Sequence, residues 1–185
     1  MTVAIGKFWK RAKGAPRFAL GLGSVAPDIP LYLMSFGGIA FFKYVKGWND
    51  KETFSHLFDK LYFHDPLWIG FHNFLHSPTM LLILAIAAMC LRARFPKTCR
   101  WALYFLAACF LHSVVDIVTH HDDGPVLFFP FDWQYRFPSP VSYWDRNHFG
   151  GPFMVFEGLL NLGLIFLLLT EWWRRKRMRS TIQSH

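Results

Sequence analysis

Four long apolar stretches constrain this chain more than any other feature of its sequence. They cover about residues 18–45, 66–91, 101–118 and 153–173. A helix needs roughly 20 apolar residues to cross the hydrocarbon core of a bilayer, and the last three stretches are close to that length. The first is longer, but prolines interrupt it at Ala26-Pro27-Asp28-Ile29-Pro30. The pattern predicts an all-α integral membrane bundle of about four transmembrane helices, forming a single domain over residues 1–185.

The positive charge of the chain indicates its topology. The net charge is +8, and most of the basic residues form three clusters beside apolar stretches: Lys7, Lys10, Arg11, Lys13 and Arg17; Arg92, Arg94, Lys97 and Arg100; and Arg174, Arg175, Lys176, Arg177 and Arg179. Lysine and arginine concentrate in cytoplasmic loops. We therefore expect a multi-pass protein of the plasma (inner) membrane with both termini cytoplasmic, and no nucleic-acid partner.

The same topology places residues 46–65 and 119–152 on the outer side of the membrane. The second of these segments contains Pro125, Pro130, Pro138 and Pro140, which exclude a long helix. It is also rich in phenylalanine, tyrosine and tryptophan, residues that favour the membrane interface. We expect an aromatic-rich outer loop.

An aspartate, Asp28, lies between two prolines inside the first apolar stretch. Aspartate is a favoured N-cap, so its carboxylate can cap the helix that follows. Ionisable residues inside a membrane are costly, however, and usually mark a functional site. Asp28 alone leaves both interpretations open.

Histidines begin the polar pattern of the later stretches. His72 and His76 are four residues apart, so on a helix they share one face and can bind one metal ion or two adjacent ions. The alternative is a pair of interfacial histidines that hydrogen-bond to neighbouring groups.

A second polar pattern, His112-x-x-x-Asp116-x-x-x-His120, repeats every four residues and predicts a stripe on one helix face. The pattern favours a metal site, and the adjacent His121 is a further candidate ligand. His148 and Glu157 form a weaker candidate pair. Imidazole and carboxylate ligands without thiolates suit Zn(II), and are also compatible with Mn(II) or Fe(II).

The order Pro27-Asp28, then His72-x-x-x-His76-Ser77, then His112-x-x-x-Asp116 resembles the YdjM-like family of predicted membrane-bound metal-dependent hydrolases. Residues 14–34, 120–123 and 137–145 resemble a subgroup often labelled as a cobalamin-biosynthesis protein. The similarity covers roughly residues 14–170.

The family is distantly similar in motif order to zinc-dependent phospholipase C enzymes. That resemblance implies Asp28, His72 or His76, His112, Asp116 and His120 as metal ligands. The final His-x-x-x-Glu of the phospholipases is not matched, because His148 and Glu157 are nine residues apart. Family members usually begin with Thr-His, whereas the first histidine here is His56, so either one ligand is lost or the start lies upstream.

Two functions follow as expectations. The first is a metal-dependent hydrolase that acts on a phosphoester of an amphiphilic or lipid substrate at the outer face, with Asp122 or Asp123 as general base. The second is a non-catalytic membrane subunit, associated with a protein partner or with other copies of itself in the bilayer. In that case a structural metal or a polar core fixes helix packing. A metal or proton conduit is less well supported, because the inner halves of the stretches are apolar.

Overall fold

The computed structural model describes residues 16–143 and 145–183, with the side chains beyond Arg174 left out. The described residues are mostly helical and contain no β-strand. A single isolated bridge pairs Val126 with Arg136. The described residues fall into two compact units, a larger one up to Pro140 and a second one from Val141 onward. The all-α prediction is confirmed, while the N-terminal basic cluster up to Lys13 and the side chains of the C-terminal cluster beyond Arg174 lie outside the described residues.

The first apolar stretch is broken where its prolines predict. Helix α2 spans Arg17–Gly23 and α3 spans Ile29–Ala40, followed by a π-helical segment, η1, over Phe41–Val45. The chain turns between α2 and α3, and Pro30 lies in the first turn of α3. Proline fits that position because its missing N–H would have no intrahelical partner there.

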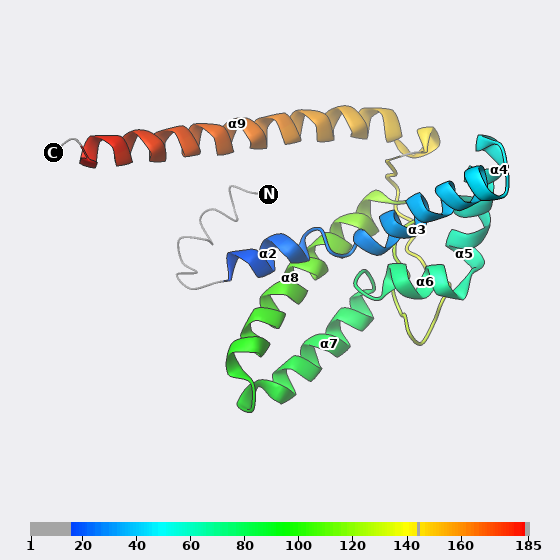
Figure 1. Cartoon of the computed structure of the whole chain (residues 1–185), viewed down its shortest axis with the longest axis horizontal. Helices are drawn as coiled ribbons and strands as arrows, with labels where there is room; N and C mark the ends of the chain where they lie inside the picture. Colours follow the sequence, from blue (N-terminus) through cyan, green and yellow to red (C-terminus); the bar gives the residue numbers. More distant parts are fainter. Residues whose placement is uncertain (1–15, 144, 184–185) are drawn as a thin grey trace. The chain divides into compact units, whose positions relative to one another are not determined.

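The second stretch is also broken, which the apolar pattern did not predict. Helix α6 spans Pro66–Asn73 and α7 spans Pro78–Cys90, and the chain bends by 54° between them (Figure 1). Ser77 caps α7 and Pro78 is in its first turn. His76 therefore lies beyond the end of α6, and the prediction that His72 and His76 share one continuous helix face is wrong.

The remaining helices include the two longest. Residues 46–65 include α4 (Asp50–Ser55), the π-helix η2 (His56–Leu61) and α5 (Tyr62–His64), and a short 3-10 turn, η3 (Leu91–Ala93), follows α7. Helix α8 spans Pro96–Thr119. In the second unit, the 3-10 turn η4 (Arg146–His148) precedes α9 (Gly150–Gln183).

Among the described helices, α8 and the Gly150–Arg174 part of α9 are long and apolar enough to cross a membrane. The bent α6–α7 pair is a third candidate span. The apolar helix over Ile29–Val45 falls in a shorter class. The structure thus supports two or three spans, and the predicted count of four is not confirmed.

Helix α8 is the main packing partner of the other helices in the larger unit. Both α2 and α7 pack against it, and α3 packs against α6 (Figure 1). Leu81 of α7 and Leu106 and Cys109 of α8 form one buried cluster. Gly23 of α2 lies so close to α8 that an added Cβ would be 2.3 Å from the Phe105 carbonyl oxygen. Small residues of this kind let membrane helices approach closely.

Residues 124–130 fill the break between α6 and α7. The Asn73 Oδ1 accepts a hydrogen bond from the Val126 N–H at 2.7 Å, and the Ser77 hydroxyl lies 3.0 Å from the Leu127 carbonyl and 3.1 Å from that of Phe129. Asn73 and Ser77 are fully buried. Residues 124–130 therefore hydrogen-bond to the buried side chains of this break, and such partners are what irregular backbone between membrane helices requires.

This arrangement predicts a stability effect at Asn73. Asn73→Leu keeps a similar volume but removes both side-chain hydrogen bonds, to Val126 and to the Ile69 carbonyl. Leaving buried polar groups unsatisfied should cost about 1–3 kcal/mol. We expect a lower Tm for the detergent-purified variant. Gln134→Leu, at an exposed position, is the control, and equal Tm values for the two variants would contradict the prediction.

Candidate metal centre

Four side chains from three separate parts of the larger unit meet at one point. Asp28 comes from the α2–α3 break, His76 from the α6–α7 break, and His112 and Asp116 from α8. One ligand atom from each lies within 4.8 Å of all the others. All four are among the residues that the sequence predicts as ligands.

The distances from the two imidazoles to their neighbours match tetrahedral coordination. The Nε2 atoms of His76 and His112 are 3.2 Å apart. Each lies 3.4 Å from Asp28 Oδ1 and 3.2 Å from Asp116 Oδ2. A tetrahedral ion with Zn–N and Zn–O bonds of 2.0–2.1 Å would separate its ligand atoms by about 3.3 Å. The residues therefore fit a single divalent ion.

Hydrogen bonds on the far side of each imidazole define its tautomer. The Nδ1 of His76 lies 3.0 Å from the His72 carbonyl oxygen, and the Nδ1 of His112 lies 3.1 Å from the Ser24 carbonyl oxygen. A carbonyl only accepts, so both Nδ1 atoms must carry a proton. In a neutral ring the Nε2 lone pair then points at the cluster. Four acceptor atoms converge, which is the donor set of a cation site with its supporting hydrogen bonds in place.

The two helix breaks supply these carbonyl groups. The last carbonyls of a helix have no intrahelical partner. His72 is in the last turn of α6, and Ser24 is the C-cap of α2. Each break therefore brings a ligand to the cluster and also frees a carbonyl that orients an imidazole.

The cluster is sealed on one side and open on another. The His76 side chain is 1% exposed, whereas those of Asp28 and Asp116 are 34% and 21% exposed. Asp28 makes no side-chain capping hydrogen bond to α3. The capping interpretation of Asp28 is therefore wrong, and its carboxylate faces the two histidines instead.

His72 lies beside the cluster but outside the group of four. Its ring packs on that of His76 with centroids 4.3 Å apart, and its Nε2 is 3.2 Å from the Tyr62 hydroxyl oxygen. Burial raises the pKa of the Tyr62 hydroxyl well above its usual value, so this group stays protonated and donates to the Asp123 carbonyl at 2.6 Å. The His72 Nε2–H therefore donates to Tyr62, and no described residue partners its buried Nδ1.

The predicted residues just after α8 lie outside the cluster. His120 has extended backbone just after α8, so the helical stripe ends at Asp116. Its Nδ1 lies 3.0 Å from Asp123 Oδ1, and the Nδ1 of His121 donates to the Ser139 carbonyl at 2.6 Å. Asp122 lines a neighbouring cavity.

The weaker pair belongs to the second compact unit. There the Nδ1 of His148 lies 2.6 Å from Asp145 Oδ2, and Glu157 is a half-buried residue of α9.

Comparison with known proteins gives one result. The family model described as YdjM inner membrane protein matches residues 1–180. No curated protein and no solved structure is significantly similar to the chain. The match spans almost the whole sequence, and the chain belongs to the YdjM inner membrane protein family.

Proposed function

We propose that this protein is a membrane-embedded metal-dependent hydrolase that cleaves a phosphoester of an amphiphilic or lipid substrate at the outer face of the inner membrane. The observation that carries the proposal is that two imidazoles and two carboxylates converge at a point where both carboxylates remain partly exposed. Backbone carbonyls orient both imidazoles. Such a donor set suits Zn(II).

Asp28, His76, His112 and Asp116 would hold the ion. A divalent ion bound there would polarise a phosphoryl oxygen and lower the pKa of a nearby water molecule. The carbonyls of His72 and Ser24 keep the two imidazoles in the tautomer that binding requires. Asp122, which is exposed on the cavity wall, and Asp123, which pairs with His120, are the proposed general bases.

The outward orientation follows from charge. Arg92 and Arg94 precede α8, and Lys97 and Arg100 lie in its first turns, so the start of α8 belongs on the cytoplasmic side. His112 and Asp116 lie in the opposite half of the same helix. The proposed site therefore faces outward.

The test is an activity assay on the full chain, purified in detergent and loaded with Zn(II), Mn(II) or Fe(II). The substrates are p-nitrophenyl phosphate, its diester and short-chain phospholipids. We expect turnover that His112→Ala lowers by more than about 100-fold, since losing a metal ligand should exceed the 10–100-fold effect of losing an outer-shell partner. Asp59→Asn, an exposed carboxylate, is the control. Absence of turnover in metal-loaded protein, or full activity in His112→Ala, would rule the proposal out.

One observation favours a second function, a non-catalytic subunit with a structural centre. All four tetrahedral positions are taken by protein side chains, as in structural zinc sites, whereas catalytic zinc keeps one position open. A metal-free polar core is a variant of this, with protonated histidines paired to the two aspartates. A structural metal predicts that chelation lowers Tm while no substrate is turned over; the polar core predicts no bound metal.

A further inference from the structure

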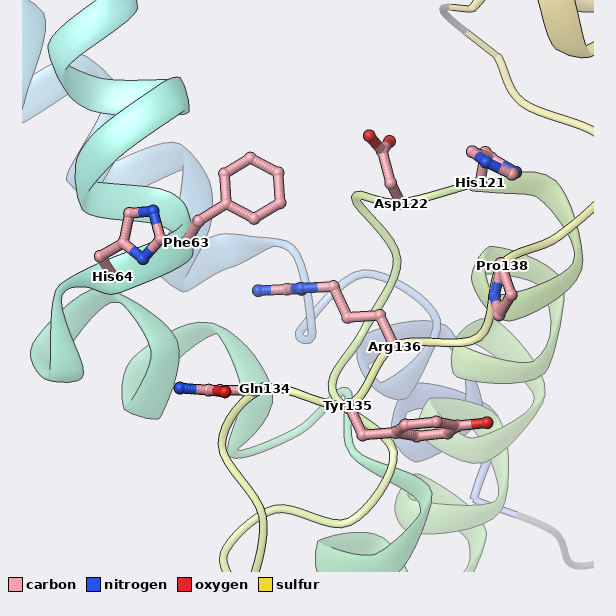
Figure 2. Close-up of a pocket in the computed structure, with 8 residues that line it drawn as sticks. All are labelled: Phe63, His64, His121, Asp122, Gln134, Tyr135, Arg136 and Pro138. Atoms are coloured by element: carbon pink, nitrogen blue, oxygen red, sulfur yellow. The ribbon is translucent and has the colours of Figure 1, made fainter.

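A cavity of about 590 Å³ lies among the outer elements of the larger unit, away from the four ligands. It is lined by Phe63, His64, His121, Asp122, Gln134, Tyr135, Arg136 and Pro138. Figure 2 shows the Arg136 side chain reaching toward Phe63 and His64, while His121 and Asp122 lie along another part of the wall. The lining thus combines a guanidinium, two imidazoles, a carboxylate and aromatic rings.

Arg136 is held in place by its surroundings. One of its N–H groups donates to the Gly124 carbonyl, and its guanidinium lies 5.0 Å from the Tyr62 ring centroid and 5.2 Å from that of Phe63. Guanidinium groups stack favourably on aromatic faces. Since a guanidinium has five donors in a planar fork, this fixed group retains donors for a ligand in the cavity.

The chemistry of the lining favours a phosphate group. Arginine binds phosphate oxygens through paired, charge-assisted hydrogen bonds. Phe63, Tyr135 and Pro138 offer apolar surface to the organic part of such a ligand. Asp122 opposes an anion, and its carboxylate is exposed at the wall.

The surroundings of the cavity favour an amphiphile. Phe131, Trp133 and Phe137, on the segment that carries Arg136, are 79%, 40% and 41% exposed. Exposed aromatic side chains are typical of the membrane interface. A lipid headgroup could therefore reach the cavity while its chains stay in the bilayer.

The cavity is also connected to the metal centre. Arg136 lies over the Tyr62 ring, the Tyr62 hydroxyl meets His72 Nε2, and the His72 ring packs on His76. A ligand at Arg136 is thus separated from a cluster ligand by two side chains, Tyr62 and His72.

We infer that this cavity binds the phosphate group of an anionic amphiphile, with Arg136 as the principal ligand-binding residue. The inference takes its substrate class from the proposed function, but it concerns binding and is measured without catalysis. It adds a recognition site to the four-residue metal cluster.

The test is isothermal titration calorimetry on the detergent-purified full chain after EDTA treatment. The probes are dihexanoyl phosphatidic acid, inorganic phosphate and dihexanoyl phosphatidylcholine. We expect Arg136→Gln to weaken phosphatidic acid binding by about 10- to 100-fold, and Arg136→Lys to recover part of the loss because it keeps the charge but not the fork. Arg92→Gln, an exposed arginine on the predicted cytoplasmic side, is the control and should bind as the parent does.

Arg136 also contacts Gly124 and Tyr62, so Arg136→Gln could misfold. A second variant keeps the inference testable in that case. Asp122→Asn removes the opposing charge at an exposed position and should tighten phosphatidic acid binding by roughly 2- to 5-fold. Tighter binding of phosphatidic acid than of inorganic phosphate would identify a lipid headgroup as the ligand, and equal binding would identify free phosphate.

Failure of the inference is distinguishable from failure of the proposed function. No binding of either anion, or binding that is unchanged in Arg136→Gln and Asp122→Asn, would overturn the inference even if turnover is found. Arg136-dependent binding in a protein with no turnover would support the inference and would contradict only the proposed hydrolase function.

Discussion

Asp116→Ala is expected to reduce the metal content of the purified protein from one equivalent to nearly none. Asp116 Oδ2 lies 3.2 Å from the Nε2 of both histidines, so removing it takes away one of the four converging ligand atoms. Loss of an outer-shell partner typically lowers metal affinity 10–100-fold, and loss of a ligand should exceed about 100-fold. Elemental mass spectrometry of the protein after dialysis against trace zinc measures the effect.

Two further variants sharpen this metal-content experiment. Asp116→Asn keeps the shape of the side chain but removes its charge, so it should also lose metal. Asp59→Asn, whose parent carboxylate is exposed and accepts a local hydrogen bond from Ser55, should keep the full equivalent. A parent protein that is folded yet binds no divalent metal would contradict the metal centre and favour the polar-core alternative.

The sequence predicts the four candidate ligands that the structure brings together. Asp28, His76, His112 and Asp116 are ionisable groups in apolar stretches, where lipid makes such groups costly unless they are partnered. The prolines around Asp28 also predict the break between α2 and α3, because proline cannot continue a helix. These signals are local, because the residues themselves and their immediate neighbours carry them.

The second helix break was missed although a local signal existed. Ser77-Pro78 is a typical N-cap and first helical residue, but the apolar run continued across it. The break changes how His72 and His76 are used: the His76 ring joins the cluster, while His72 contributes its carbonyl and packs alongside. Helix spacing alone therefore does not show which residues join the cluster of four: His72 lies before the break, and His120 lies beyond the end of α8.

Long-range features of the site had no signal in the sequence. The Ser24 carbonyl that orients His112 is a backbone group 88 residues away. The placement of Tyr62 between His72 and the Asp123 carbonyl joins segments 61 residues apart. The position of the Arg136 guanidinium over the Tyr62 and Phe63 rings is likewise set by the fold. Such contacts depend on tertiary packing, which composition and spacing do not specify.

Gly23→Ala is expected to disrupt both the fold of the larger unit and its metal centre. The new methyl group would lie 2.3 Å from the Phe105 carbonyl oxygen and 2.9 Å from the Ala108 Cβ, so α2 must move away from α8. Overpacking usually costs about 1–3 kcal/mol, and a clash with backbone should lie at the upper end of that range or beyond it. The movement would also pull the Ser24 carbonyl from His112, so metal affinity should fall with Tm.

Gly21→Ala provides a matched control on the same helix. An added Cβ at Gly21 meets no atom within 4 Å, and alanine is favoured over glycine in a helix by about 1 kcal/mol. This variant should keep its metal and have an equal or higher Tm. If Gly23→Ala behaved like Gly21→Ala in both measurements, the close α2–α8 contact would not be what positions the Ser24 carbonyl beside His112. If it lost metal with an unchanged Tm, the contact would act on the centre through Ser24 rather than through the stability of the whole unit.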